Sequence, residues 1–225
     1  MRNVIHSEFF LYDADIPICC TVRNYQEKDF KELIAIQSEC FPAPFPEELW
    51  WNVEQLSSHL AHFPEGAICV EVNGELAGSL TCLRVSYDSK TPLHTWEDIT
   101  NNGYISTHDE QGNALYVVDI SIRPKFRKLG LGKVLMQSTY YLVIELGLDR
   151  LLGGGRMPGY KKYAKDLTAD AYLKEVMSGH IKDPVISFLL RCGRMPVTVL
   201  PNYLEDEDSL NYAVLMEWNN PFQQN

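Results

Sequence analysis

The stretch "ALYVVDISIRPKFRKLGLGKVLMQSTYYLVIEL", residues 114–146, decides the fold of this chain. Its first nine residues, Ala114 to Ile122, are hydrophobic apart from Asp119 and Ser121, which predicts a strand. Residues 132–146 are apolar on nearly every side, which predicts a buried central helix that ends at Gly147. A basic connection that contains glycines joins the two, so the stretch predicts a strand, an anion-binding loop and a helix in succession.

The connection carries the pattern Arg-x-x-Gly-x-Gly from Arg127 to Gly132. It is not a dinucleotide fingerprint, because Leu135 replaces the third glycine, and it is not a Walker A loop, because Arg127 and Val134 stand at required positions. Glycines let the backbone approach a ligand, and free N–H groups at a helix N-terminus favour a pyrophosphate. A solvated surface connection is the alternative. The segment 123–133 holds five basic residues and no acid: Arg123, Lys125, Arg127, Lys128 and Lys133.

The whole chain is acidic, with a formal net charge of −10 and a pI near 5.0 over 225 residues. That charge argues against nucleic acid as a partner. No stretch approaches the length of a membrane span, and the N-terminus lacks a signal peptide, so we expect a cytoplasmic protein without membrane contact. The six cysteines lack a C-x-x-C pair and His59 and His62 lack zinc-helix spacing, so we assign reduced thiols and no metal.

The rest of the chain predicts further strands and helices around this centre. An Asn73-Gly74 hairpin joins two strands, and Thr168 is expected to cap a helix that ends at Gly179. Two long stretches, 86–113 and 156–182, are expected as insertions on the substrate side. The other predicted strands are 18–25, 67–72, 76–85, 149–155, 194–200 and 212–218, and the other predicted helices are 29–41, 46–63, 169–177 and 183–193.

This ordered set, with the loop "IRPKFRKLGLG", resembles the GNAT superfamily of N-acetyltransferases over nearly the whole chain. The segments "GGRMPGY", "DPVISFLLRCG", "VLPNYL" and "YAVLMEW" further resemble a subgroup whose domain is also found fused to a carbon–nitrogen hydrolase. The resemblance implies a mixed α/β fold of α+β type in a single domain, 1–225. Its central twisted sheet should be mostly antiparallel, with about seven strands, splayed in the middle and flanked by helices.

The resemblance also implies a site for acetyl-CoA. Backbone N–H groups of the loop would hold the pyrophosphate, and main-chain groups of Ile120 and Ile122 would pair with the pantetheine arm in the splay. Asp183 and Ser187 would face the thioester end, although Asp183 is also suited to cap the helix that follows it. The residues expected to bind the co-substrate are Ile120, Ser121, Ile122, Arg127, Lys128, Leu129, Gly130, Leu131, Gly132, Lys133, Asp183 and Ser187.

Transfer to an alkyl amine needs a base, because only about one molecule in 2,500 is in the neutral amine form at pH 7. Several family members carry a Glu where this chain has Tyr116, and Asp119 is the only acid inside the strand. In a regular strand the side chains of Asp119 and Tyr116 would point to opposite faces of the sheet, unless a bulge lies between them. The alternative role for Asp119 is to orient neighbouring loops by hydrogen bonds. We therefore list Asp119 and Tyr116 as candidate catalytic residues. The family's usual tyrosine acid is replaced by Leu189, and the possible substitutes are Tyr160, Tyr163 and Tyr203.

These features predict an acetyl-CoA-dependent N-acetyltransferase that acts on a primary amine of a small molecule or peptide by direct attack in a ternary complex. Two alternatives remain open: a non-catalytic module that binds or senses CoA or acyl-CoA, and an acyltransferase with a different acyl donor or a hydroxyl acceptor. The acidic run 205–208 either attracts a cationic amine or is a solvated hairpin tip. The expected partners are acetyl-CoA and the amine, with a possible homodimer.

Overall fold

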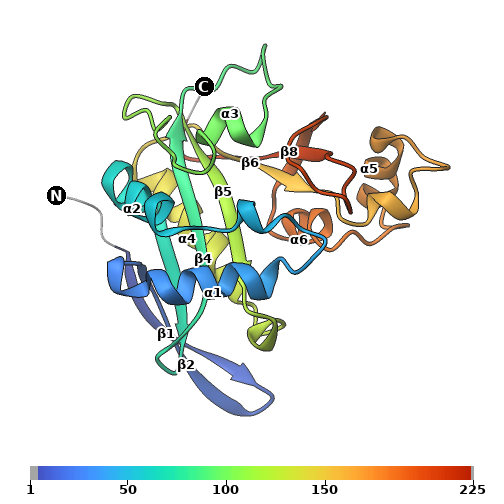
Figure 1. Cartoon of the computed structure of the whole chain (residues 1–225). Coiled ribbons are helices and arrows are strands. Elements are labelled where there is room, and N and C mark those ends of the chain that lie inside the picture. Colours follow the sequence, from blue (N-terminus) through green and yellow to red (C-terminus); the bar gives the residue numbers. More distant parts are fainter. Residues whose placement is uncertain (1–4, 224–225) are drawn as a thin grey trace.

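Eight strands form one sheet in the computed structural model, which describes residues 5–223. The order across the sheet is β1-β2-β3-β4-β5-β6-β8-β7, and every neighbouring pair is antiparallel except β5 and β6 (Figure 1). The strands are β1 (His6–Asp13), β2 (Ile16–Asn24), β3 (Ala67–Val72), β4 (Glu75–Val85), β5 (Ala114–Ile122), β6 (Arg150–Arg156), β7 (Met195–Leu200) and β8 (Ala213–Asn219).

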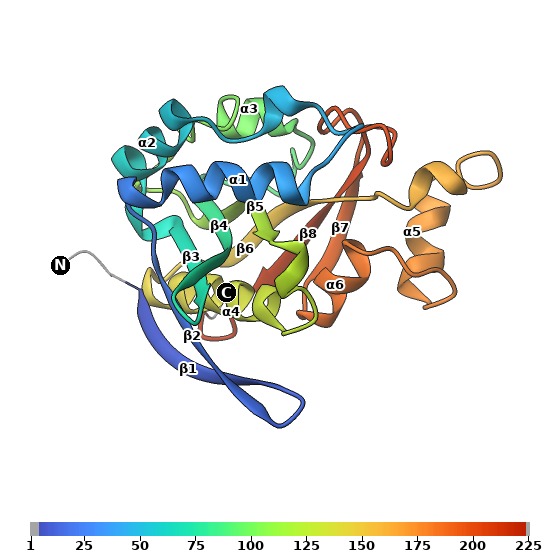
Figure 2. The same cartoon turned by 60° about the horizontal axis from the view of Figure 1, so that its bottom comes forward.

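Helices cover both faces of this sheet. Figure 2 shows α1, α2 and α3 on one face, with α4 and α6 on the other. None of the helices within residues 5–223 combines the length and the apolar content needed to cross a bilayer. The α-helices are α1 (Phe30–Cys40), α2 (Val53–His62), α3 (Trp96–Thr100), α4 (Leu131–Glu145), α5 (Ala169–Met177) and α6 (Ile186–Arg191).

The sheet opens in its middle, between β5 and β6. These parallel strands pair only over Ala114–Tyr116 and Arg150–Leu152. Beyond that point β5 continues along β4, while β6 turns away with β8 (Figure 1). The register between β4 and β5 also shifts, because Thr81 pairs with Asp119 and Cys82 with Val117, which leaves Val118 as a bulge. The expected splayed, mostly antiparallel sheet is therefore confirmed.

Helix α4 follows the loop after β5, as predicted. Gly147, at φ +62°, ends it as expected. Its inner face is buried through residues such as Leu135, Met136 and Leu142. The helix was expected to be buried at the centre, and it is buried on one side only, because Tyr141 is 52% exposed on the outer face. One apolar stripe is enough to anchor the helix on the sheet.

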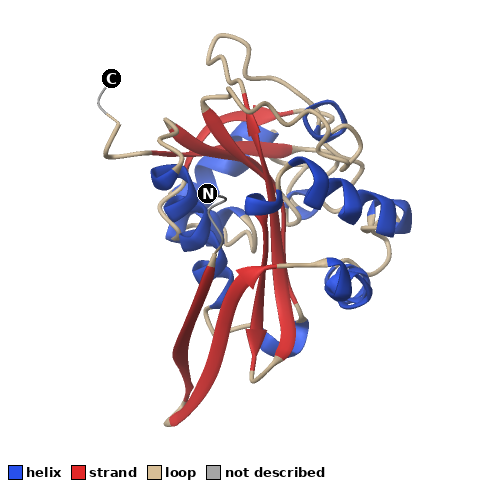
Figure 3. Cartoon of the chain, turned by 90° about the vertical axis from the view of Figure 1, so that its left-hand side faces the viewer, coloured by secondary structure: helices blue, strands red, loops and turns tan. Residues whose placement is uncertain are grey.

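Two other predictions needed correction. The expected helix 46–63 is split: Trp50 is extended, and α2 begins only after Asn52, whose side chain accepts a hydrogen bond from the Gln55 N–H at 2.8 Å. Strand β1 was not expected, and it raises the strand number from about seven to eight. It pairs with β2 over residues 6–13 and forms an arm that extends from the body (Figure 3).

Candidate active site

The loop after β5 carries a row of unpaired backbone donors. Lys128 at φ +75° and Gly130 at φ +84° adopt left-handed conformations, which turns the chain into α4. The N–H groups of Lys133 and Val134 both donate to the Gly130 carbonyl, at 3.0 and 3.2 Å. Within residues 5–223, the five N–H groups from Lys128 to Gly132 donate to no protein acceptor. The loop is therefore a cradle of donors at the positive end of a helix.

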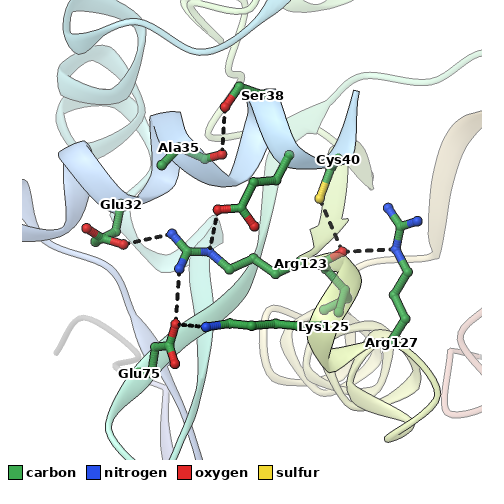
Figure 4. A network of polar contacts seen from close by, with 10 residues as sticks. Glu32, Ala35, Ser38, Cys40, Glu75, Arg123, Lys125 and Arg127 are labelled. Atoms are coloured by element: carbon green, nitrogen blue, oxygen red, sulfur yellow. Dashed lines mark hydrogen bonds and ion pairs between the residues drawn. The ribbon is translucent and has the colours of Figure 1, made fainter. Parts of the chain in front are cut away.

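Two of the five basic residues counted in the loop segment are already paired. Figure 4 shows Arg123 beneath α1, where it binds Glu32 at 2.7 Å and Glu75 at 3.2 Å. Lys125 also binds Glu75. The acids come from α1 and β4, distant in sequence from the loop, so the local charge count overstated the positive charge. Arg127, Lys128 and Lys133 form no ion pair within the part of the chain that the structure describes.

The backbone of β5 presents alternate residues to the opening. The Arg123 N–H donates to the Ala77 carbonyl at 2.9 Å, so the antiparallel register directs the main-chain groups of Ser121 toward β4 as well. Those of Ile120 and Ile122 point to the side where β6 has left. The Ile122 carbonyl accepts from Arg127 Nε and from the Cys40 thiol, each at 3.2 Å. The Ile122 N–H and the main chain of Ile120 are thus the groups directed into the gap.

Helix α6 lines the other side of the gap. A Cβ at Gly132 would come within 3.2 Å of the Phe188 ring, so glycine at this position favours a close approach of α4 and α6. Leu189, at the position of the family's tyrosine, packs against Gly155. Ser187 is half-buried in the first turn of α6, and a role for its side chain toward a ligand stays a prediction.

Asp183 lies inside the fold and not at the gap. It is fully buried, and one carboxylate oxygen accepts from the Val185 and Ile186 N–H groups, both at 2.9 Å. The other accepts from the Tyr172 hydroxyl at 2.8 Å and the Gly159 N–H at 3.0 Å. With four donors on two oxygens, Asp183 caps α6 and joins it to the preceding segments. The carboxylate thus has the expected alternative role as a cap, and a role for Asp183 toward the thioester stays a prediction.

Asp119 stands at the bulge of β5 with its carboxylate toward α1. One oxygen accepts from Gln37 Nε2 at 3.0 Å and from the Ser121 hydroxyl at 2.8 Å. Burial raises the pKa of Asp119 to about 6, although these two hydrogen bonds act to lower it. The side chain of Ser121 thus belongs to the Asp119 network. A half-buried carboxylate with a pKa near neutrality has the properties of a general base.

Asp119 lines a pocket whose walls include several aromatic side chains. Phe41 and Phe45 come from the connection after α1, Trp51 precedes α2, and Trp96 begins α3. Charged and polar groups also line it, since Asp119 of β5, Arg156 at the end of β6 and the ring of Tyr203 are all present. Part of the expected insertion 86–113 therefore reaches the pocket, through Trp96.

Tyr116 reaches the pocket only through a second tyrosine. Its ring is fully buried, and its hydroxyl lies 2.9 Å from the Tyr203 hydroxyl and 2.8 Å from His94 Nε2. His94 Nδ1 is 2.9 Å from the Pro92 carbonyl, which can only accept, so Nδ1 carries the proton and Nε2 accepts from Tyr116. Tyr116 in turn accepts from Tyr203. The three side chains form a directional hydrogen-bond chain that ends at the pocket.

Of the three tyrosines considered as substitutes for the missing acid, Tyr203 is the one that lines the pocket. Burial raises its pKa to about 12. Tyr160 donates to the Leu167 carbonyl at 3.2 Å and packs against Tyr172, so its contacts lie within the expected insertion 156–182. Tyr163 also packs against Tyr172.

Two partners of this site were not predicted. Gln37 is a buried polar residue of α1, and His94 belongs to an irregular segment. The sequence does contain a signal for Gln37, because helical periodicity places this polar residue on the apolar face of its helix. Nothing in the local sequence marks His94.

No group of three or more potential metal-ligating side chains occurs within residues 5–223. His59, considered in the sequence as one of a histidine pair, is buried between the Tyr25 hydroxyl at 2.9 Å and the Gly103 carbonyl at 2.7 Å. Burial lowers the pKa of His59 to about 4. It is a neutral ring that holds α2 against the 86–113 segment.

Comparison with known proteins places this geometry in a family. The family model of the acetyltransferase (GNAT) family matches residues 30–154. An uncharacterized N-acetyltransferase, YkwB of Bacillus subtilis, is 52% identical over 97% of each chain. A probable hydrolase, YhcX of the same organism, is 42% identical over 88% of this chain, which spans only 38% of that protein's length. This partial match agrees with the expected subgroup in which the domain is fused to a hydrolase.

Solved structures show the same fold at low sequence identity. A GNAT-like decarboxylase, GphF, in complex with isobutyryl-CoA, has a TM-score of 0.73 at 20% identity and covers 88% of this chain and 98% of its own. A putative acetyltransferase, yncA of Salmonella typhimurium, with its cofactor acetyl-CoA, has a TM-score of 0.57 at 13% identity and covers 91% and 95%. The chain therefore belongs to the GNAT family of acetyltransferases, and it is an acyltransferase.

Proposed function

We propose that this chain transfers an acetyl group from acetyl-CoA to a primary amine, by direct attack in a ternary complex. One observation carries the proposal: the gap between β5 and β6 has the donor cradle at one end and the Asp119 pocket at the other. A carrier with a diphosphate at one end, an extended arm and a thioester at the other matches that order of groups.

The CoA side of the reaction is assigned to the loop and the exposed strand backbone. The N–H groups from Lys128 to Gly132 would bind the diphosphate, with Arg127 and Lys133 as nearby unpaired cations. The main chain of Ile120 would pair with the amide groups of the pantetheine arm, as an added strand does. The two solved structures of the same fold that contain isobutyryl-CoA and acetyl-CoA support a CoA-type co-substrate.

The acceptor side is assigned to Asp119. The ammonium proton passes to Asp119, directly or through a water, because an acid with a pKa near 6 is ionised at neutral pH. The nitrogen lone pair then forms a C–N bond to the thioester carbon. As the tetrahedral adduct collapses, the C–S bond breaks with its electron pair on sulfur, and the nitrogen releases its second excess proton to water to give the neutral amide. The transferred proton returns to solvent from Asp119 after the product leaves.

Tyr203 is assigned the role of acid toward the leaving thiolate. Tyr203 lines the pocket, and its hydroxyl donates to Tyr116 in the free protein. It would turn toward the sulfur to deliver its proton and would recover a proton from water once the thiol has left. An alkyl thiol has a pKa of about 8.5, so the thiolate is already a good leaving group, and proton delivery speeds the reaction without being essential for it.

The test is release of free thiol from acetyl-CoA over a library of amines. The proposal expects release with at least one acceptor and micromolar CoA binding by calorimetry. CoA binding without turnover for any amine would support a sensing module instead. Turnover only with propionyl, isobutyryl or succinyl donors, or only with hydroxyl acceptors, would identify a different acyl transfer.

A further inference from the structure

The pocket that holds Asp119 also holds a guanidinium. Arg156 is the last residue of β6, and it lines the pocket opposite the β5 carboxylate, at the point where the two strands have separated. Its charge acts to lower the pKa of Asp119, which places the two groups within electrostatic reach of each other. A cation beside the proposed base is a disadvantage for an acceptor that carries only an ammonium group.

Arg156 is fixed in place by its surroundings. Its Nε donates to the buried Asp206 carboxylate at 2.8 Å, and the Ser209 hydroxyl donates to the same oxygen. Its guanidinium carbon lies 4.9 Å from the ring centre of Phe45 and 5.6 Å from that of Phe41. The ion pair holds the guanidinium on one edge and the two rings lie beside it, so little freedom is lost when a ligand binds.

The remaining edge of the guanidinium is free. Neither Nη1 nor Nη2 bonds to a protein acceptor within residues 5–223, and neither is a buried unsatisfied atom. Both nitrogens are therefore accessible to solvent in a pocket with apolar walls. A fixed guanidinium with two free nitrogens matches the two oxygens of a carboxylate.

We propose that the acceptor is an amino carboxylate, that is, a free amino acid whose carboxylate binds Arg156 while its amine faces Asp119. This inference rests on the proposed acyl transfer and names its substrate class. The walls of Phe41, Phe45 and Trp51 suit an amino acid with an apolar side chain. One acidic and one basic group in the pocket match the two charges of such a zwitterion.

Matched acceptors separate the carboxylate from the rest of the molecule. L-Leucine, L-leucinamide and 3-methylbutylamine share the amine and the side chain, and only leucine has the carboxylate. We expect kcat/KM for leucine to exceed that for either analogue by more than tenfold. The same comparison with the other protein amino acids, β-alanine and 4-aminobutyrate identifies the preferred side chain and the spacing between the two groups.

Variants of Arg156 test the assignment. Arg156→Gln is expected to reduce kcat/KM for the preferred amino acid about a hundredfold and to leave that for its decarboxylated amine unchanged or raised. Arg156→Lys keeps the charge beside Asp206 but loses the two-nitrogen edge, so it should give an intermediate loss. Lys162→Gln, which removes an exposed cation outside the pocket, is the matched control and should change neither value.

A binding measurement makes the result independent of turnover. N-acetyl amino acids and their amides are titrated by calorimetry into the CoA-loaded protein. Binding of the acids that is at least tenfold tighter than that of the amides and is lost in Arg156→Gln supports the site, even where no thiol is released and acyl transfer itself fails. Equal turnover or equal binding for acids and amides overturns the inference and leaves acyl transfer standing. Absence of Arg156-dependent binding across the whole panel also overturns it.

Discussion

At the scale of single residues, the pKa of Asp119 links stability and activity. Its folded value of about 6 lies above the ordinary value of 3.8, so the folded state retains a proton that the unfolded chain has lost between these pH values. Stability therefore falls as pH rises through this window and then levels off above pH 6. The gap between the two pKa values corresponds to about 3 kcal/mol.

Asp119→Asn is expected to separate the two effects. The neutral amide avoids the cost of a buried charge, so the variant should gain up to about 3 kcal/mol in unfolding free energy at pH 8 and less at pH 5. Turnover should fall about a hundredfold or more, and the rise of kcat/KM near pH 6 should disappear. Denaturant unfolding and a pH–rate profile measure both. Asp166→Asn, at an exposed position, is the control, and an unaltered pH limb removes Asp119 from the mechanism.

Tyr203→Phe tests the hydrogen-bond chain at the pocket. The ring still packs against Gly154, so the fold and the CoA affinity should not change. Loss of the hydroxyl should reduce kcat about tenfold to a hundredfold, because proton delivery to the thiolate is lost. Tyr163→Phe, outside the pocket, should have no effect on kcat. Equal rates for the two variants would assign Tyr203 a packing role only.

At the scale of elements, the loop between β5 and α4 depends on one glycine. Gly130, at φ +84°, has open space where a Cβ would lie, so the cost of a side chain there is backbone strain and obstruction of the ligand. Gly74, at φ +82°, is equally open but lies in the β3–β4 hairpin. The two positions differ in location and hardly at all in conformation.

The pair provides a controlled test of the donor cradle. Gly130→Asp should weaken CoA binding by well over tenfold by calorimetry, since a carboxylate would lie beside the diphosphate, and Gly130→Ala should weaken it less. Gly74→Ala should cost similar stability and leave CoA affinity unchanged. If Gly130→Asp binds CoA as the parent does, the diphosphate is held somewhere else.

Turns, caps and helix ends could be predicted from the sequence where a few neighbouring residues determine them. Some features depend only on residues close together in the chain, so the sequence predicts them directly. They are the Asn73-Gly74 turn, the helix end at Gly147, and the Thr168 cap, whose hydroxyl accepts from the Ala171 N–H at 3.2 Å. The loop from Arg127 to Gly132 was predicted for the same reason.

Contacts between distant segments could not be predicted in this way. Asp119 meets Gln37 across 82 positions, and Arg123 meets Glu32 across 91. The role of Arg156 likewise depends on Asp206, 50 positions away. Only the fold brings these partners together, so the sequence marked Asp119 as a candidate but not the residues that set its environment.

At the scale of the whole molecule, the β1–β2 arm is the least covered part of the sheet. Phe10, Tyr12 and Ile16 are 65, 67 and 69% exposed on it, and β1 is an edge strand (Figure 3). Exposed apolar groups on a free edge favour association with another chain. The expected homodimer stays a prediction, and this arm is the surface on which we would test it.

Serine at these three positions should shift any self-association to higher protein concentration by about tenfold or more. Sedimentation velocity over a concentration series measures the shift. Leu93→Ser, which changes an apolar residue exposed to 63% away from the arm, is the control. An unchanged sedimentation profile for the triple variant means that the arm does not mediate contact between copies.

The separation of β5 from β6 gives the sheet an internal edge whose amides are shielded only when something lies between the strands. In the free protein, deuterium should replace hydrogen rapidly at the Ile120 and Ile122 amides, while the neighbouring amides of Ser121 and Arg123, which face β4, should exchange slowly. Adding CoA should slow exchange at the Ile120 and Ile122 amides and leave the other amides of β5 unchanged. An alternating pattern of this kind along one strand would reveal the cleft in solution without a crystal.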